Sequence, residues 1–460
     1  MEFCSTMKHE SDSLCFMSKT FRPWDVEQRW LLPPSVHELV PTGHVAHFVR
    51  DLAREELDLG AILSTYTEER GYPPYHPAMM VALLLYAYSR GVYSSRKIAQ
   101  ACEERVDFMA VTAMNRPDFR TIAAFRRRHL KALGELFVQV LKLCRAAGLV
   151  KLGHVSLDGT KVQANASVHK AMSYGRMREA EKKLAAEVAA WFARAEATDA
   201  AEDREHGAER RGDEMPDWMA SKVARLERIR VAKAALEAEA KAPPPGLDDD
   251  GPGPSSGMTG RTTPPPRGPD GGPPDRAQRN FTDPDSRIQP TKPGVIAGYN
   301  AQIAVDGAHQ IIIAQRVQTS PADARSLKPL LSAARNVLGA NPKEVSADAG
   351  FCSEANLVHL ARRGINGFVA TGRGRHGKPN GGGKRWRPGS RVAAMATKLK
   401  RGGWRSHYRL RKQIVEPVFG HIKHARGFRQ FLLRGLEKVR GEWAMICTAH
   451  NLLKLASAKG

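Results

Sequence analysis

The repeat of hydrophobic and polar positions changes near residue 150 and divides the chain into two parts. Between residues 33 and 148, apolar residues recur at helical spacing, as at Val45, Phe48, Val49 and Leu52. Short segments rich in proline, glycine or serine separate these runs and are typical of helix ends. The first part is therefore predicted to be an all-helical unit of five or six helices.

After Gly153 the pattern alternates with a period of two, which is typical of strands. The predicted strands are residues 153–158, 299–306, 310–317, 344–348 and 367–370. The second and third are joined by a connection of hairpin length, and helices are predicted from Asp323 to Leu338 and from Asn356 to Arg363. This order of elements predicts a mixed α/β sheet.

Two stretches separate the first predicted strand from the second. Residues 168–242 are rich in Ala, Glu, Arg and Lys, and predict two long helices that are broken near 199–216 and form a helical hairpin. Residues 241–280 contain 11 prolines and 8 glycines, so 243–280 is predicted to be a disordered linker. Both are predicted insertions in a unit that spans 149–460, preceded by a helical unit at 17–148 and an unstructured leader at 1–16.

The charge of the chain is strongly positive and unevenly distributed. The formal net charge is +23, and residues 371–440 contain 20 Lys or Arg but only two acids. Aromatic residues are interleaved with these basic residues, which indicates a folded surface that binds a polyanion, nucleic acid first. A membrane is not expected, because the longest apolar run, 79–88, is too short to span one. Six dispersed cysteines suit a reducing cytoplasm.

Three acids are candidates for chemistry. Asp158 ends the first predicted strand in VSLDGTK, and Asp348 ends the fourth in VSADAGF. Glu416 lies between apolar residues in the basic segment and is expected to be partly buried. Strand-end aspartates are often only turn formers or caps. Three carboxylates beside a basic surface nevertheless predict a magnesium-binding clamp for displacement at phosphorus. Pro417 predicts that Glu416 lies at a helix start or a kink.

Several longer motifs carry a family resemblance. The stretch YRLRKQIVEPVFGHIKHARGF, followed by RGLEKVRGEWAMICTAHNLLKL, resembles the C-terminal signature of bacterial insertion-sequence DDE transposases. The segment YHPAMMVALLLYAYSRGVYSSRKIAQAC resembles their InsH-type helical N-terminal domain, and LDGTKVQANAS and SADAGF resemble their two aspartate motifs. The resemblance implies an RNase H-like catalytic domain in which Asp158, Asp348 and Glu416 bind two Mg²⁺ ions, for which Mn²⁺ can substitute.

The resemblance also implies residues that contact phosphate. Tyr408, Arg411 and Lys423 match the family signature by residue type. The spacing from Arg411 to Glu416 is one residue longer than in the family, and Lys412 stands where the arginine is expected, so either can be the phosphate ligand. The implied partner is double-stranded DNA, both the terminal repeats and the target, bound by a homodimer in the bacterial cytoplasm at the nucleoid.

The function predicted from these features is DNA transposition by cleavage at the element ends and strand transfer. Two alternatives remain: a nuclease of the same fold without strand transfer, and a non-catalytic DNA-binding protein. No nucleotide cofactor is expected, because the glycine-rich segment 372–378 is followed by Pro379 where a P-loop has Ser or Thr. His421 and His424 are three residues apart, but no further His or Cys cluster joins them to form a metal site.

Overall fold

The computed structural model describes residues 35–67, 73–206, 217–241, 272–291, 294–372 and 386–459. The predicted leader and most of the predicted linker lie outside these residues, as does 207–216 of the predicted helix break. Residues 199–206 of that break are instead helical, so the prediction is wrong there. The predicted helical N-terminal region is confirmed, with seven helices among its described residues because two short ones were not predicted. They are α1 Val45–Glu55, α2 Gly60–Leu63, α3 Pro77–Ser89, α4 Ser95–Glu104, α5 Val106–Thr112, α6 Phe119–Arg128 and α7 Leu130–Ala146.

Helix α3 forms the centre of this helical region. Pro77 begins the helix, where its missing N–H costs nothing, and the His76 ring accepts a hydrogen bond from the Ala78 N–H. The helix carries apolar residues on all of its faces, and nearly every residue of it is buried. A helix without a polar face has to be covered on every side, which accounts for its central place among the other helices.

The predicted mixed α/β sheet is confirmed. Its strand order is β4-β5-β1-β7-β8, with β6 also paired to β5. Strand β5 runs antiparallel to β1, β4 and β6, whereas β7 and β8 continue the sheet parallel to β1. The strands are β1 His154–Gln163, β4 Arg287–Thr291, β5 Gly294–Asp306, β6 Ile312–Gln318, β7 Glu344–Ala347 and β8 Asn366–Val369.

The prediction that the first strand ends at Asp158 is wrong. Strand β1 continues to Gln163, because β5 pairs with it along its whole length, from Val155 opposite Asp306 to Gln163 opposite Gly298. Asp158 therefore lies in the middle of a strand, with its backbone fixed by pairing. Asp348, predicted as the last residue of the fourth strand, directly follows β7 and caps the 3₁₀ turn η3 Ala349–Phe351.

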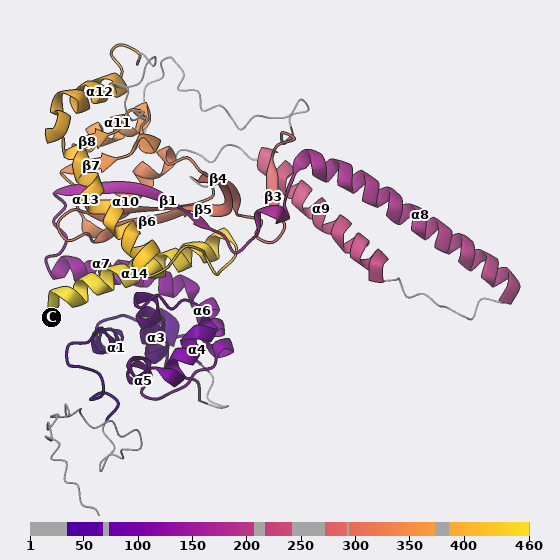
Figure 1. Ribbon diagram of the computed structural model, residues 1–460, viewed down its shortest axis with the longest axis horizontal. Helices are drawn as coiled ribbons and strands as arrows, with labels where there is room; N and C mark the ends of the chain where they lie inside the picture. The colour runs from indigo at the N-terminus through magenta and orange to yellow at the C-terminus, as the bar shows by residue number, and fades with distance from the viewer. Residues whose placement is uncertain are drawn as a thin grey trace, which may run out of the picture.

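Five helices complete the α/β part. They are α10 Leu327–Leu338, α11 Glu354–Arg362, α12 Arg391–Gly402, α13 Leu410–Gly420 and α14 Leu436–Lys459. Helix α14 lies between the sheet and the N-terminal helices, where it packs on α7, α3 and β6, whereas α11 and α12 lie at the opposite end of the molecule (Figure 1). One hydrophobic core consequently runs from the helical region into the sheet. Among the described residues, no helix is both long and apolar enough to cross a bilayer.

The predicted helical hairpin is confirmed and projects from the side of the sheet as α8 Tyr174–His206 and α9 Asp217–Lys241 (Figure 1). The Lys222–Glu187 and Lys233–Glu181 ion pairs, at 2.7 and 2.8 Å, join its two helices. Strands β2 Ala171–Ser173 and β3 Gln278–Asn280 pair at its base. The linker prediction is therefore wrong for β3, whose backbone hydrogen bonds are satisfied by β2.

The buried carboxyl group of Glu442 on α14 gives a testable pH dependence. Burial raises the pKa of Glu442 to about 7, although the Leu432 and Leu433 N–H groups donate to it. The folded protein thus retains this proton above the unfolded pKa of about 4.5, so stability falls as the pH rises from there to about 7. We expect Glu442→Gln to stabilise the fold by about 1–3 kcal/mol at pH 8 and much less at pH 5, measured by thermal unfolding. An equal effect at both pH values would contradict this assignment.

Candidate active site

Helix α13 brings a guanidinium group against two of the three candidate acids. Arg411 Nη2 lies 2.8 Å from Asp158 Oδ2, and Arg411 Nη1 lies 3.5 Å from Glu416 Oε1. Asp158 comes from β1 and Glu416 from α13, so packing of this helix across the sheet joins residues that are far apart in sequence. The structure therefore places Asp158 and Glu416 around one cation.

The second aspartate lies beside the first. Strand β7 pairs with β1 in parallel up to Ala347 opposite Leu157, so Asp348 and Asp158 each directly follow a residue of this last pair. The Asp348 carboxylate accepts a hydrogen bond of 2.9 Å from the Gly350 N–H, and Asp158 accepts one of 2.9 Å from the Gly159 N–H. The three predicted acids are thus brought to one region of the sheet.

The electrostatics of Asp158 suit a site for a cation. Burial, helped by the nearby Asp348 charge and opposed by Arg411, raises the pKa of Asp158 to about 6. Two nearby carboxylates repel one another unless a positive charge lies between or beside them. Oxygen ligands are those that Mg²⁺ prefers, so the donor set fits this metal. Arg411 supplies the compensating charge in the structure.

The prediction that Glu416 is partly buried is wrong. Its side chain is 49% exposed. The opposite face of α13 carries the buried residues Ile414, Val415, Val418 and Phe419. Helical periodicity places Glu416 away from that face, although apolar residues flank it in sequence.

Glu416 also does not lie at a helix start. Helix α13 begins at Leu410 and continues through Pro417. Proline leaves the carbonyl of Gln413 without its usual intrahelical donor, and the Gln310 side chain donates to that carbonyl at 3.0 Å. A π-helical segment, η6 His421–Ala425, follows the helix.

The four predicted phosphate ligands differ in their surroundings. Arg411 faces the carboxylates, whereas Lys412 is exposed on the next position of α13. Tyr408 is half-buried, and burial raises its pKa while Arg411 lowers it. Lys423 donates a hydrogen bond of 3.0 Å to the backbone carbonyl of Lys161 on β1. The structure thus brings Arg411, Tyr408 and Lys423 to the sheet and leaves Lys412 at the surface.

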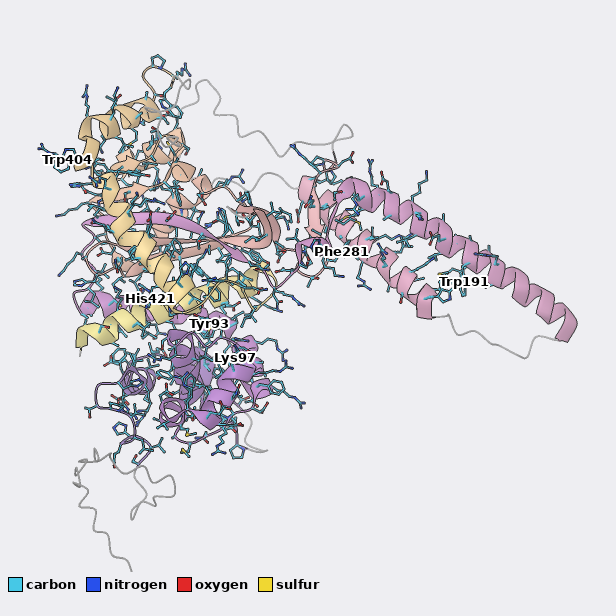
Figure 2. The ribbon with its side chains drawn as sticks, in the orientation of Figure 1. Tyr93, Lys97, Trp191, Phe281, Trp404 and His421 are labelled. Carbon is cyan, nitrogen blue, oxygen red and sulfur yellow. The ribbon has the colours of Figure 1, made fainter. Side chains whose placement is uncertain are left out.

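The basic segment forms an exposed surface around α12 and α13. Its exposed basic residues include Arg391, Lys400, Arg401, Arg405, Arg409 and Lys412. Trp404 is 72% exposed, stands out at the edge of the molecule in Figure 2, and lies 5.0 Å from the Arg405 guanidinium carbon. Arg426 differs because it is buried, and its carbonyl accepts a hydrogen bond from the Tyr93 hydroxyl of the helical region.

Histidines form a separate cluster at the start of β1. His154 Nδ1 lies 3.0 Å and His407 Nδ1 lies 2.6 Å from Glu344 Oε2. Within the described ranges, this is the one group of three His, Cys, Asp or Glu residues whose ligand atoms all lie within 4.8 Å of one another. These separations are those of hydrogen bonds, so the cluster is satisfied without a metal. His421 instead packs near the ring of His450.

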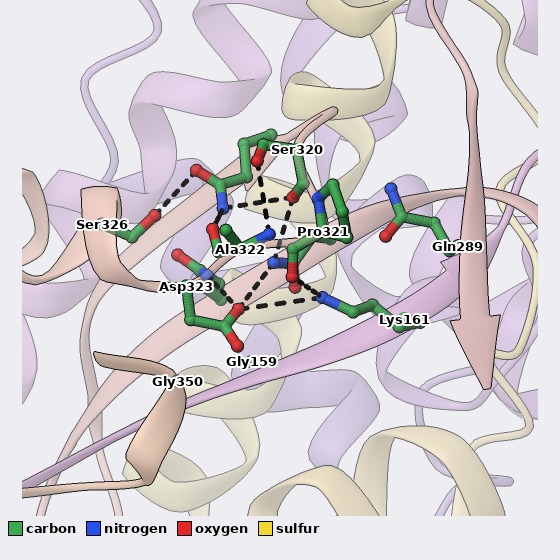
Figure 3. Close-up of polar contacts among 12 residues, drawn as sticks. Gly159, Lys161, Gln289, Ser320, Pro321, Ala322, Asp323, Ser326 and Gly350 are labelled. Atoms are coloured by element: carbon green, nitrogen blue, oxygen red, sulfur yellow. Dashed lines mark hydrogen bonds and ion pairs between the residues drawn. The ribbon is translucent and has the colours of Figure 1, made fainter. Parts of the chain in front are cut away.

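Sequence reasoning missed Asp323, which lies behind the two aspartates. Figure 3 shows its side chain beside Gly159 and Gly350, with a dashed line to Lys161. The Asp323 Oδ1 atom lies 3.8 Å from the Lys161 ammonium. The signal in the sequence was a glycine one residue after Asp158 and two residues after Asp348, since glycine in or beside a strand often marks a close approach of another group.

Comparison with protein families gives two matches. Residues 34–128 match a transposase domain (DUF772), and residues 387–456 match a transposase DDE domain. The first match covers α1 to α6, and the second includes Glu416. No curated protein and no solved structure matches the chain.

Proposed function

Because residues 34–128 and 387–456 match transposase family models, we propose that the chain is an insertion-sequence DDE transposase, which cleaves DNA at the ends of its element and joins the released 3′ ends to target DNA. The observation that carries this proposal is the contact of one guanidinium, that of Arg411, with both Asp158 and Glu416. It brings the first aspartate motif to the helix in the DDE domain match. A nuclease without strand transfer would share this geometry, so the products distinguish the two.

We assign Asp158, Asp348 and Glu416 as the ligands of two Mg²⁺ ions, with Mn²⁺ as a substitute. Bound at such a site, these ions supply Lewis-acid stabilisation of the phosphate and lower the pKa of an attacking water. Asp158 is fixed by strand pairing, and Asp348 by the hydrogen bond from Gly350. Glu416 is half-exposed and therefore open to solvent and to DNA.

Arg411 has a second role in this proposal. Its charge compensates Asp158 in the free protein, where burial of an unpaired carboxylate is costly. With metal held by the carboxylates, the Arg411 guanidinium would be free to contact a DNA phosphate through two parallel N–H groups. Tyr408 and Lys423, which flank α13 in the chain, and the exposed Lys412 are assigned as further phosphate contacts.

Roles for the other parts of the chain are proposed from the sheet order and from the position of each part. The antiparallel strands β6, β5 and β1, continued by parallel β7 and β8, support an RNase H-like catalytic unit at 149–460. Residues 17–148 are assigned to binding of the terminal repeats, and a homodimer to pairing of the two element ends. The exposed basic surface of α12 and α13 is assigned to the DNA backbone.

DNA affinity is expected to depend steeply on salt, because lysine and arginine contacts release counterions from phosphate. Replacing both Lys400 and Arg401 on α12 by Ala should reduce the slope of log affinity against log salt by about 0.9 for each phosphate that is no longer neutralised. Fluorescence anisotropy with duplex DNA measures this slope. Arg228→Ala on α9 is the matched control and should leave it unchanged. A flat salt dependence of the wild type would refute a phosphate-binding role for this surface.

The proposed activity is tested with a plasmid that carries the DNA flanking the reading frame, a second target plasmid and Mg²⁺. We expect cleavage at the element ends and joined products in the target plasmid, both abolished by EDTA. Cleavage without joined products would favour the nuclease, and binding without cleavage would refute both enzymes.

A further inference from the structure

Asp323 lies in the loop between β6 and α10, where it precedes the 3₁₀ turn η2 Ala324–Ser326. An aspartate at this position usually caps the turn, but the Asp323 side chain makes no capping hydrogen bond. Its Oδ1 atom instead accepts hydrogen bonds from Asn300 Nδ2 at 2.6 Å and from Gln302 Nε2 at 2.7 Å. The side chain is therefore directed onto the sheet.

The two side-chain amides that donate to Asp323 leave their own oxygen atoms unsatisfied. Asn300 and Gln302 are fully buried on β5, and within the described part of the chain their side-chain oxygens have no hydrogen-bond partner. A buried unsatisfied oxygen costs about 1–3 kcal/mol. The structure leaves two such oxygens unsatisfied. Both amides are instead oriented so that their NH₂ groups donate to Asp323.

The Asp323 carboxylate is wedged between the glycines of the two aspartate motifs. A methyl group added at Gly159 would lie 2.9 Å from Asp323 Oδ1, and one added at Gly350 would lie 2.7 Å from Asp323 Oδ2. Neither glycine has a positive φ, so its backbone conformation is open to other residues. Space for the Asp323 carboxylate therefore explains why both motifs carry glycine.

The same glycines orient the two candidate metal ligands. The Gly159 N–H donates to Asp158, and the Gly350 N–H donates to Asp348, each at 2.9 Å. Successive residues of a strand face opposite sides, so Gly159 meets Asp323 on one face of β1 while Asp158 meets Arg411 on the other. Asp323 thus supports both aspartates from behind the sheet.

The loop that carries Asp323 is itself held in place. Gln318 donates to the carbonyls of Ser320 and Ala322, and the Lys161 ammonium donates to the carbonyl of Pro321 at 2.7 Å (Figure 3). Asn356 joins the other side of the loop to the segment that follows Gly350, through the carbonyls of Ala324 and Phe351. Asp323 can set the separation of β1 and the segment after β7 only if its own position is fixed, and these contacts fix it.

We propose that Asp323 is a positioning residue that sets the separation of Asp158 and Asp348, and thereby the affinity of the site for divalent metal. This inference rests on the proposed function for the identity of the metal ligands. It differs from a direct role in catalysis, because the Asp323 carboxylate accepts hydrogen bonds from the amides of β5 and lies against the two glycines.

Binding of Mn²⁺ alone to the full-length protein tests the proposal, with free Mn²⁺ measured by electron paramagnetic resonance. Asp323→Ala removes the wedge and should weaken Mn²⁺ binding about 10- to 100-fold, the range found when groups that orient metal ligands are lost. Asp323→Asn keeps the shape and an oxygen for both amides, so it should recover most of the affinity. If Asn binds as weakly as Ala, positioning by shape is overturned.

Two further variants separate positioning from general stability. Gly350→Ala should also weaken Mn²⁺ binding, because the added methyl would lie 2.7 Å from Asp323 Oδ2 and 3.0 Å from Asp348 Oδ1. The double variant Asp323→Ala/Gly350→Ala should bind more tightly than Gly350→Ala alone, because it removes the closer of these two contacts. Asp283 is the matched control: it is a buried carboxylate that accepts a hydrogen bond from the Tyr299 hydroxyl. Asp283→Ala should lower the melting temperature and leave Mn²⁺ affinity unchanged.

The outcomes distinguish this inference from the proposed function. Mn²⁺ binding that is weakened by Asp323→Ala in a wild type that cleaves no DNA would support the inference and refute the function. Wild-type Mn²⁺ affinity in Asp323→Ala, or a loss no larger than that in Asp283→Ala, would overturn the inference and leave the function standing. A wild type that binds no Mn²⁺ would overturn both.

Discussion

The Asp158→Asn variant is expected to bind DNA as tightly as the wild type and to cleave none of it. The substitution keeps the shape of the side chain and removes the charge that gathers metal beside Asp348. The loss should exceed the roughly 10- to 100-fold that removal of an orienting group costs, because Asp158 is assigned as a direct ligand. Gel assays of plasmid cleavage in Mg²⁺ measure the rate, and anisotropy in EDTA measures binding.

The control for this variant follows from the ion pair with Arg411. Removing one partner of a largely buried ion pair leaves the other uncompensated, so some loss of stability is expected as well. Thermal unfolding of the variant shows whether the fold persists at the assay temperature. Cleavage at the wild-type rate by folded Asp158→Asn protein would refute the assignment of this residue.

The Glu416→Gln variant is expected to lose cleavage and to bind metal weakly, with little change in melting temperature. Glu416 is half-exposed, and its 3.5 Å contact with Arg411 is therefore an ion pair of the kind that contributes only about 0–1 kcal/mol. The exposed position removes the competing explanation of a buried structural partner. Loss of activity without loss of stability would thus indicate a role at the metal.

Glu437 provides the matched control for Glu416. It is the other acid in the basic segment, and it lies exposed in the first turn of α14. Glu437→Gln makes the same change in net charge and should cleave DNA at the wild-type rate. A Glu416→Gln protein that retains full activity but melts at a lower temperature would contradict the metal assignment and favour an ion-pair role.

The periodicity of the sequence predicted the main elements of the fold, because apolar spacing reflects burial. It predicted the end of β1 wrongly, since residues after Asp158 lose their alternation where Gly159 and Lys161 face Asp323. Strands β2 and β3 were missed because they are short and pair with each other across the insertion, and β4 was missed because it is a short strand that pairs with the start of the neighbouring strand β5. Whether these short segments form strands depends on tertiary contacts, which the local sequence pattern does not contain.

The residues of the candidate site were also only partly predictable from the sequence. The two aspartate motifs and the glutamate could be predicted from sequence because each combines an unusual residue type with a distinct local pattern. Exposure of Glu416 could not, because flanking apolar residues lie on another face of α13. Asp323 gave no signal of its own, since an aspartate before a helix ordinarily caps it, and only the packing against Gly159 and Gly350 shows a different role.

The most direct test of the central claim, that Asp158, Asp348 and Glu416 form one divalent metal site, is anomalous diffraction from crystals grown with Mn²⁺. We predict anomalous peaks within bonding distance of oxygens of all three carboxylates, with the Arg411 guanidinium displaced from Asp158. Mn²⁺ bound only at the His154, Glu344 and His407 cluster, or no peak beside the carboxylates at saturating Mn²⁺, would contradict the account.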